Sequence, residues 1–303
     1  MVAACGGGNP WLEEDGGGDG ETPAPTIPAE LAGDLGGVTY DPVAQTLTVT
    51  GVALDPNTNE TTETATTYRR RPGLDRNGYE AYTAQSGSLD RHTTAYVREI
   101  NGTQAAIVMT GGQFGHYFGG STYSRSGTFS APDFGPLVAG QENSGSVTYL
   151  GNYVGLLNGP GDGGDLKAVT PGTPVDIIPV QAAEVTGQVA INADFGQDMR
   201  VNGEIYNRVI VDNPGIVLEN LELSPTALTT DGTFVGVVTQ DSGSSTVGNY
   251  GGVFGGTDAT EVAGTVFVQD HIQALDNEEE YGMFVLSQCG TANADPLCNQ
   301  PSP

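Results

Sequence analysis

Basic residues are scarce in this chain. Its 303 residues include ten lysines and arginines against 37 aspartates and glutamates, a formal charge of −27, and Lys167 is its single lysine. Nucleic acids and anionic membranes are bound largely through Lys and Arg, so this composition argues against both as partners. An acidic surface also keeps a protein soluble at high salt. We therefore expect a marine or halophilic bacterial source.

Long apolar runs and helical apolar stripes are lacking as well. No segment is long and apolar enough for a transmembrane helix, and no apolar stripe repeats with the helical period of 3.6 residues. The 46 glycines and 18 prolines indicate many turns between short strands instead. The sequence therefore predicts an all-β protein.

Catalytic signatures are also missing. The three histidines, His92, His116 and His271, are dispersed and form no HExxH pattern, and no G-x-S-x-G motif is present. Each histidine is more simply interpreted as a surface or hydrogen-bonded side chain than as a metal ligand. We predict a protein that is not an enzyme and holds no metal.

The first cysteine marks a possible lipid anchor. Residues 2–5 read VAAC, which fits a bacterial lipobox that follows a signal peptide, and the alternative is a chance cysteine. Residues 6–28 are rich in Gly, Pro, Asp and Glu, as expected for a disordered tether. We predict that residues 1–32 are lipobox and tether, and that Cys5 alone attaches the chain to the membrane.

The other two cysteines lie near the end of the chain. Cys289 and Cys298 enclose a short segment of small residues and a proline, CGTANADPLC. Exported proteins favour disulfides, whereas two cysteines with no nearby histidine make a poor zinc site. We predict a disulfide, with free thiols or a metal site as the alternatives.

Strand and turn signals divide the remaining chain into two regions. In residues 33–140, strands are expected at 43–52, 79–85, 93–100 and 103–109, with Asn101-Gly102 as a type I′ turn. A polar loop is expected at 55–67 and a glycine-rich aromatic stretch at 111–123. Residues 128–131 are expected to start the next sheet.

Residues 141–303 read as eight strands, enough for an up-and-down barrel without free edges. They are expected at 146–157, 185–195, 200–211, 216–228, 233–241, 247–255, 261–270 and 282–288, with a long loop at 158–183 and an acidic loop at 276–280. Glycines inside strands at Gly236, Gly251, Gly252 and Gly264 indicate tight curvature or close backbone approach.

Three segments of this region resemble transferrin-binding protein B-like surface lipoproteins. Residues 146–159 (SVTYLGNYVGLLNG) are similar to the family's first barrel strand, and residues 189–208 to its next hairpin. Residues 250–267 (YGGVFGGTDATEVAGTVF) resemble a further hairpin motif, in which Glu261 is expected to cap a strand or pair across the hairpin. The resemblance implies a small handle sheet followed by an eight-stranded antiparallel up-and-down β-barrel. The single handle and barrel match the single-lobe members that depend on a lipoprotein translocator.

The resemblance also implies a binding module whose ligand contacts lie in variable loops. His116, Tyr117 and Phe118 are weak ligand candidates, because a histidine and a tyrosine among aromatics could ligate haem iron. The alternative is a loop that packs its aromatics on the barrel mouth. Residues 159–165 only weakly resemble a calcium loop, and a flexible polar loop is the simpler interpretation. Four of the nine arginines lie close together in the sequence: Arg69, Arg70, Arg71 and Arg76. They would clamp an anion or, as is more common, form ion pairs with acidic side chains of the same chain.

We therefore expect a lipoprotein of the Gram-negative outer membrane, facing the cell surface. It would capture an iron-bearing protein or a haem-type ligand and pass it to a TonB-dependent receptor. The alternative is a structural or adhesive surface protein with no nutrient ligand, and a carbohydrate hydrolase is a distant third class.

Overall fold

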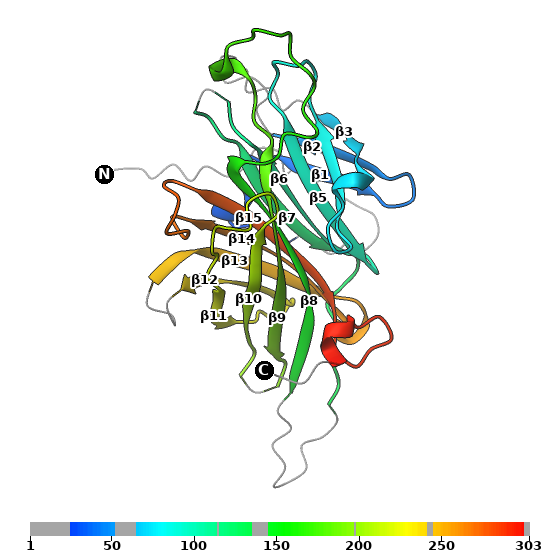
Figure 1. The fold of residues 1–303 in the computed structure, drawn as a ribbon. Coiled ribbons are helices and arrows are strands. Elements are labelled where there is room, and N and C mark those ends of the chain that lie inside the picture. Colours follow the sequence, from blue (N-terminus) through cyan, green and yellow to red (C-terminus); the bar gives the residue numbers. More distant parts are fainter. Residues whose placement is uncertain are drawn as a thin grey trace, which may run out of the picture.

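The strands of the protein form two antiparallel sheets (Figure 1). The computed structural model describes residues 25–51, 65–113, 115–134, 145–196, 198–240 and 245–299. The first sheet has seven strands in chain order: β1 (Gly37–Asp41), β2 (Thr46–Thr50), β3 (Thr66–Arg70), β4 (Glu80–Ala84), β5 (Thr93–Ile100), β6 (Thr103–Thr110) and β7 (Gly119–Arg125). We call it the handle sheet.

The second sheet is a closed barrel of eight antiparallel strands. They are β8 (Ser146–Pro160), β9 (Ala182–Asp194), β10 (Arg200–Ile210), β11 (Leu221–Ala227), β12 (Thr233–Gln240), β13 (Ser245–Gly255), β14 (Glu261–Gln269) and β15 (Glu279–Ser287). The predicted fold class, a handle sheet followed by an up-and-down barrel, is confirmed.

Helices are short in both parts. They are α1 (Ala29–Ala32) and the 3-10 turns η1 (Pro72–Leu74), η2 (Val175–Ile177), η3 (Thr257–Ala259) and η4 (Pro296–Asn299). None of the helices within the described ranges is both long and apolar enough to cross a membrane.

The predicted turn between β5 and β6 is confirmed. Ile100 pairs with Thr103, so Asn101 and Gly102 form a two-residue turn, with φ of 50° and 77°. Both positive values are those that a type I′ turn requires. Local sequence therefore sets the register of the two longest handle strands.

Other predictions in the handle sheet are wrong. The strand expected at 43–52 is the shorter β2, it is preceded by β1, and residues 128–131 form no strand. The glycine-rich stretch contains β7, because its glycines make room for another backbone: a Cβ on Gly120 would lie 2.0 Å from the Ala32 carbonyl oxygen. Most of the predicted polar loop at 55–67 lies outside the described residues, but Thr66 already belongs to β3.

The barrel strands differ from the prediction mainly at their ends. β11 begins at Leu221 instead of residue 216, and β15 begins at Glu279, within the predicted acidic loop. The predicted acidic loop therefore ends at residue 278, and Glu278 and Glu280 are buried, at 3% and 0% exposed. Their side chains are neutralised inside the protein, as described below.

Side chains fill the interior of the barrel. The rings of Phe195 and Phe254 lie 4.9 Å apart, those of Phe234 and Phe254 5.3 Å, and Tyr149 and Phe254 5.5 Å. The strand glycines accommodate these and other rings, since a Cβ would lie 2.4 Å from Phe234 on Gly252 and 2.4 Å from Phe284 on Gly264. The barrel is therefore a packed core, as expected for eight strands.

The handle sheet packs against the outside of the barrel. One apolar cluster joins handle residues such as Tyr96 and Ile107 to barrel residues such as Val253 and Met283. Glu261 pairs with Gly255 across the hairpin, as expected, and its Oε1 also accepts a 2.7 Å hydrogen bond from Asn101 Nδ2 of the handle turn. Apolar packing and this buried contact tie the two sheets together.

The predicted domain limits at residues 32 and 140 stay predictions. Residue 140, like Cys5 and the lipobox, lies outside the described residues. Within them, β7 ends at Arg125 and β8 begins at Ser146.

Candidate functional site

The loop that joins β8 to β9, residues 161–181, is fastened to the handle sheet. Lys167 donates from Nζ to the Ser86 carbonyl at 2.7 Å and from its backbone N–H to Gln85 Oε1 at 2.8 Å. The Val180 N–H donates to the Gly112 carbonyl at 3.1 Å. Loops of the barrel and of the handle thus form one continuous surface, which we call the junction surface.

Asp165 fixes the start of this loop. Its side chain is 5% exposed, forms an ion pair with Arg71 and accepts a hydrogen bond from His92 Nε2 at 2.9 Å. Burial, assisted by the Arg71 charge, lowers the pKa of His92 to about 4. His92 is therefore neutral at pH 7, with its proton on Nε2. The expected flexible loop at 159–165 is wrong, because Asp165 is buried and paired.

Gln113 brings three loops of the junction surface together. Its Nε2 donates to the carbonyl of Leu89 at 2.7 Å and to that of Ile177 at 3.1 Å. The same three loops carry exposed apolar side chains: Leu89 is 43% exposed, Tyr117 42% and Val175 84%. We call these three side chains the apolar patch.

The predicted ligand candidates lie at or beside this patch. His116 is exposed, and its backbone pairs with that of Gln113. Tyr117 rests on the backbone of Gly112, where a Cβ would lie 2.4 Å from the ring. Phe118 is half-buried against the handle core, and its ring lies 4.3 Å from the Arg91 guanidinium carbon. Only His116 and Tyr117 are thus presented to solvent, and ligand binding by the three residues stays a prediction.

Most of the arginine cluster is paired internally, as the simpler interpretation predicted. Arg70 donates to both carboxylate oxygens of Asp75, at 2.5 and 2.6 Å. Arg76 lies 2.5 Å from the buried Glu184, whose pKa burial raises and Arg76 lowers in part. The Arg69 side chain makes no hydrogen bond or ion pair with any residue in the described ranges, while its backbone pairs with Thr83 of β4.

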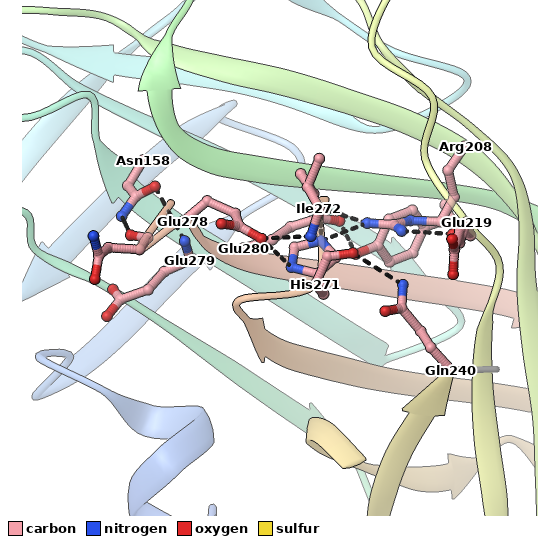
Figure 2. Close-up of polar contacts among 11 residues, drawn as sticks. Asn158, Arg208, Glu219, Gln240, His271, Ile272, Glu278, Glu279 and Glu280 are labelled. Atoms are coloured by element: carbon pink, nitrogen blue, oxygen red, sulfur yellow. Dashed lines mark hydrogen bonds and ion pairs between the residues drawn. The ribbon is translucent and has the colours of Figure 1, made fainter. Parts of the chain in front are cut away.

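A buried ion cluster occupies the barrel interior, where Arg208 of β10 meets His271, which follows β14, and Glu280 of β15 (Figure 2). Arg208 donates to Glu280 Oε2 at 2.6 Å and lies 3.0 Å from His271 Nε2. Tyr153 donates to the other carboxylate oxygen of Glu280 at 2.6 Å. Burial alone would raise the pKa of Glu280, but Arg208, His271 and Tyr153 outweigh it and hold this pKa at about 2.

The cluster also fastens the neighbouring loops. Arg208 donates to the Glu219 carbonyl at 2.8 Å, Gln240 to the His271 carbonyl at 3.2 Å, and the Ile272 N–H to Glu278 Oε1 at 2.5 Å. Sequence reasoning missed this cluster. The available signal was the two-residue period of β15, which places Glu280 on the same inward face as Phe284 and Leu286.

Two further sites can be compared with their predictions. Cys289 and Cys298 form the predicted disulfide, with a Cα–Cα distance of 5.4 Å. The Cys289 N–H donates to the Thr148 carbonyl of β8 at 2.9 Å, which holds the closed loop against the barrel. In the described part of the chain, no three His, Cys, Asp or Glu side chains converge as a metal site would need.

Comparison with known proteins finds similarity at the level of structure. No family model matches the sequence, and no curated protein matches it. The chain is similar to transferrin binding protein B from Haemophilus parasuis (12% identity, 83% of this chain and 52% of that chain, TM-score 0.39). It is also similar to that protein from serogroup B Neisseria meningitidis (13%, 76% and 38%, TM-score 0.31). A structure described as a surface lipoprotein matches with 14% identity over 83% of this chain and 96% of that chain, TM-score 0.34.

The first two are transferrin binding proteins B, the proteins after which the family that the sequence resembles is named. The chain spans about half the length of the Haemophilus parasuis protein.

Proposed function

We propose that this protein is a non-catalytic binding module that holds a protein partner on the apolar patch of Leu89, Tyr117 and Val175. The observation that carries the proposal is the convergence of three loops, from both sheets, on the single side chain of Gln113. Exposed apolar side chains within a polar surface are typical of interaction sites.

The packing of the molecule supports a surface site over an internal one. Aromatic side chains fill the barrel, so a ligand of the barrel lumen would have to displace core residues. The junction surface, in contrast, is held by Lys167, Gln113 and Asp165 before any partner arrives. A preformed surface lowers the entropic cost of association.

The proposal includes the partner class that the sequence resemblance implies. The partner would be an iron-bearing protein, or a haem-type ligand held near His116 and Tyr117, passed on to a TonB-dependent outer-membrane receptor. A lipid on Cys5 would anchor the protein at the cell surface of a Gram-negative bacterium. The lipobox pattern at residues 2–5 and the exposure of His116 support these details.

The test is a binding measurement on the full chain with transferrin, haemoglobin and haem as probes. Leu89→Glu and Val175→Glu would place a charge in the patch and should weaken protein binding about 30-fold or more. Val43→Glu is the matched control, because Val43 is 94% exposed on the β1–β2 turn. His116→Ala and Tyr117→Ala should abolish a haem absorbance shift if the ligand is haem itself.

Two results would contradict the proposal. Equal binding by the patch variants and the wild type would exclude the patch. No binding of any probe by the wild type would favour the structural or adhesive alternative.

A further inference from the structure

We propose that a second site, a cavity between β3 and the loop after β8, binds a small ligand through a carboxylate, with Arg69 as the receiving cation. The cavity has a volume of about 430 Å³, within the roughly 300–1,000 Å³ of small-molecule sites. Its lining includes Arg69, Arg70, Arg71 and Gly73, from β3 and the turn after it, and Asp162 and Asp165, from the loop after β8. This site is independent of the apolar patch and of the protein partner proposed above.

The charges around the cavity single out Arg69. Arg70 is occupied by both oxygens of Asp75, and Arg71 is occupied by Asp165. Arg69 is exposed, and its side chain makes no hydrogen bond or ion pair with the residues that the structure describes. A guanidinium carries five N–H donors in a planar fork that matches a carboxylate. Arg69 is therefore the cation at this cavity whose donors remain available to a ligand.

The walls of the cavity are fixed before a ligand enters. Asp165 is buried between Arg71 and His92. Asp162 Oδ1 accepts the Gly164 N–H at 2.7 Å, and its own N–H donates to Asp212 Oδ2 at 3.1 Å. Binding would consequently order little beyond the side chain of Arg69.

The acidic wall restricts the charge of the ligand. Asp162 is exposed, lines the same cavity and would repel a second negative charge, and the net charge of −27 adds to this repulsion. The same carboxylate would attract an ammonium or amide N–H. We therefore assign the site to monocarboxylates, with a zwitterion such as an amino acid preferred. A glutamate side chain of a protein offers the same group.

The arginine side-chain N–H signals of ¹⁵N-labelled full-length protein can test this assignment. Acetate, glycine, succinate and N-acetylglutamate α-amide are titrated separately, with sodium chloride at equal ionic strength as the reference. Glycine should shift the Arg69 signal at lower concentration than acetate, and succinate should bind more weakly than either. Tighter binding of N-acetylglutamate α-amide than of glycine would identify a protein side chain as the source of the carboxylate.

Variants complete the test. Arg69→Gln should weaken glycine binding about tenfold or more, whereas Arg200→Gln, at an exposed arginine on β10, should leave it unchanged. Asp162→Asn should remove the preference for glycine over acetate. Thermal unfolding of each variant confirms that it is folded. The proposal is overturned if carboxylates shift Arg69 no more than chloride does, or if Arg69→Gln and Arg200→Gln bind glycine equally.

Discussion

Arg208→Met tests the buried ion cluster most directly. The substitution keeps a long side chain but removes the guanidinium that lies 2.6 Å from Glu280 Oε2. Glu280 and the Arg208 side chain are both 0% exposed. Glu280 would thus be left with a buried negative charge that water cannot reach.

The size of the effect follows from the contacts that remain. Breaking a buried ion pair from one side costs about 3–5 kcal/mol. Glu280 would keep Tyr153 at 2.6 Å and His271 at 3.2 Å, so we expect the lower end of that range. The lost bond to the Glu219 carbonyl adds little, because Glu219 is exposed and water can replace the guanidinium.

Urea unfolding of four proteins provides the assay: wild type, Arg208→Met, Glu280→Gln and the double variant. Removing the charge of Glu280 should recover most of the loss, with a coupling energy of about 2–3 kcal/mol. Arg200→Met, at an exposed arginine on β10, should stay within about 0.5 kcal/mol of the wild type. The reasoning is refuted if Arg208→Met costs less than about 1 kcal/mol or if the two substitutions are additive.

Three further predictions concern acid, glycine and the disulfide. The pKa of Glu280 is lowered from 4.5 to about 2, so its contribution to stability is complete above pH 4.5 and is lost as pH falls toward 2. Acid unfolding of Glu280→Gln should lack the loss of stability in that pH range. Gly264→Ala should lower the free energy of unfolding by about 1–3 kcal/mol, because the added carbon crowds a ring and a backbone carbonyl. Gly73→Ala should lower it by less than about 0.5 kcal/mol in thermal unfolding, because nothing lies within 4 Å of the added carbon. Reducing Cys289–Cys298, nine positions apart, should cost about 2.5 kcal/mol on the chain-entropy model, and an unchanged urea midpoint in reductant would contradict this.

Local signals made much of the fold predictable. Asn101-Gly102 predicted one hairpin because this pair readily adopts the two positive φ values of a type I′ turn, which closes two strands in two residues. Gly264 indicated crowding correctly, because its missing side chain makes room for Phe284. In both cases the cause lies within a few residues or on an adjacent strand.

Distant pairings were not predictable in the same way. Glu280 was expected in an acidic loop, yet it lies in β15 and pairs with Arg208, 72 residues away. Gln113 carries no motif, and its role appears only when the loops of Leu89 and Ile177 meet. The sequence gives the charge of a side chain but not the side chain with which it pairs. The ion pair of Glu280 and the contacts of Gln113 could therefore be found only in the three-dimensional structure.

The N-terminal segment has a mechanical consequence. Leu31 is 0% exposed in the apolar cluster between the two sheets. Its carbonyl accepts a hydrogen bond from the Ser121 hydroxyl at 2.7 Å, and the Asp34 N–H donates to the Gly119 carbonyl. A pull on the chain before residue 25 is therefore transmitted into the joint between handle and barrel, because Leu31 is seated there. Under load, extraction of this segment would precede the unfolding of either sheet.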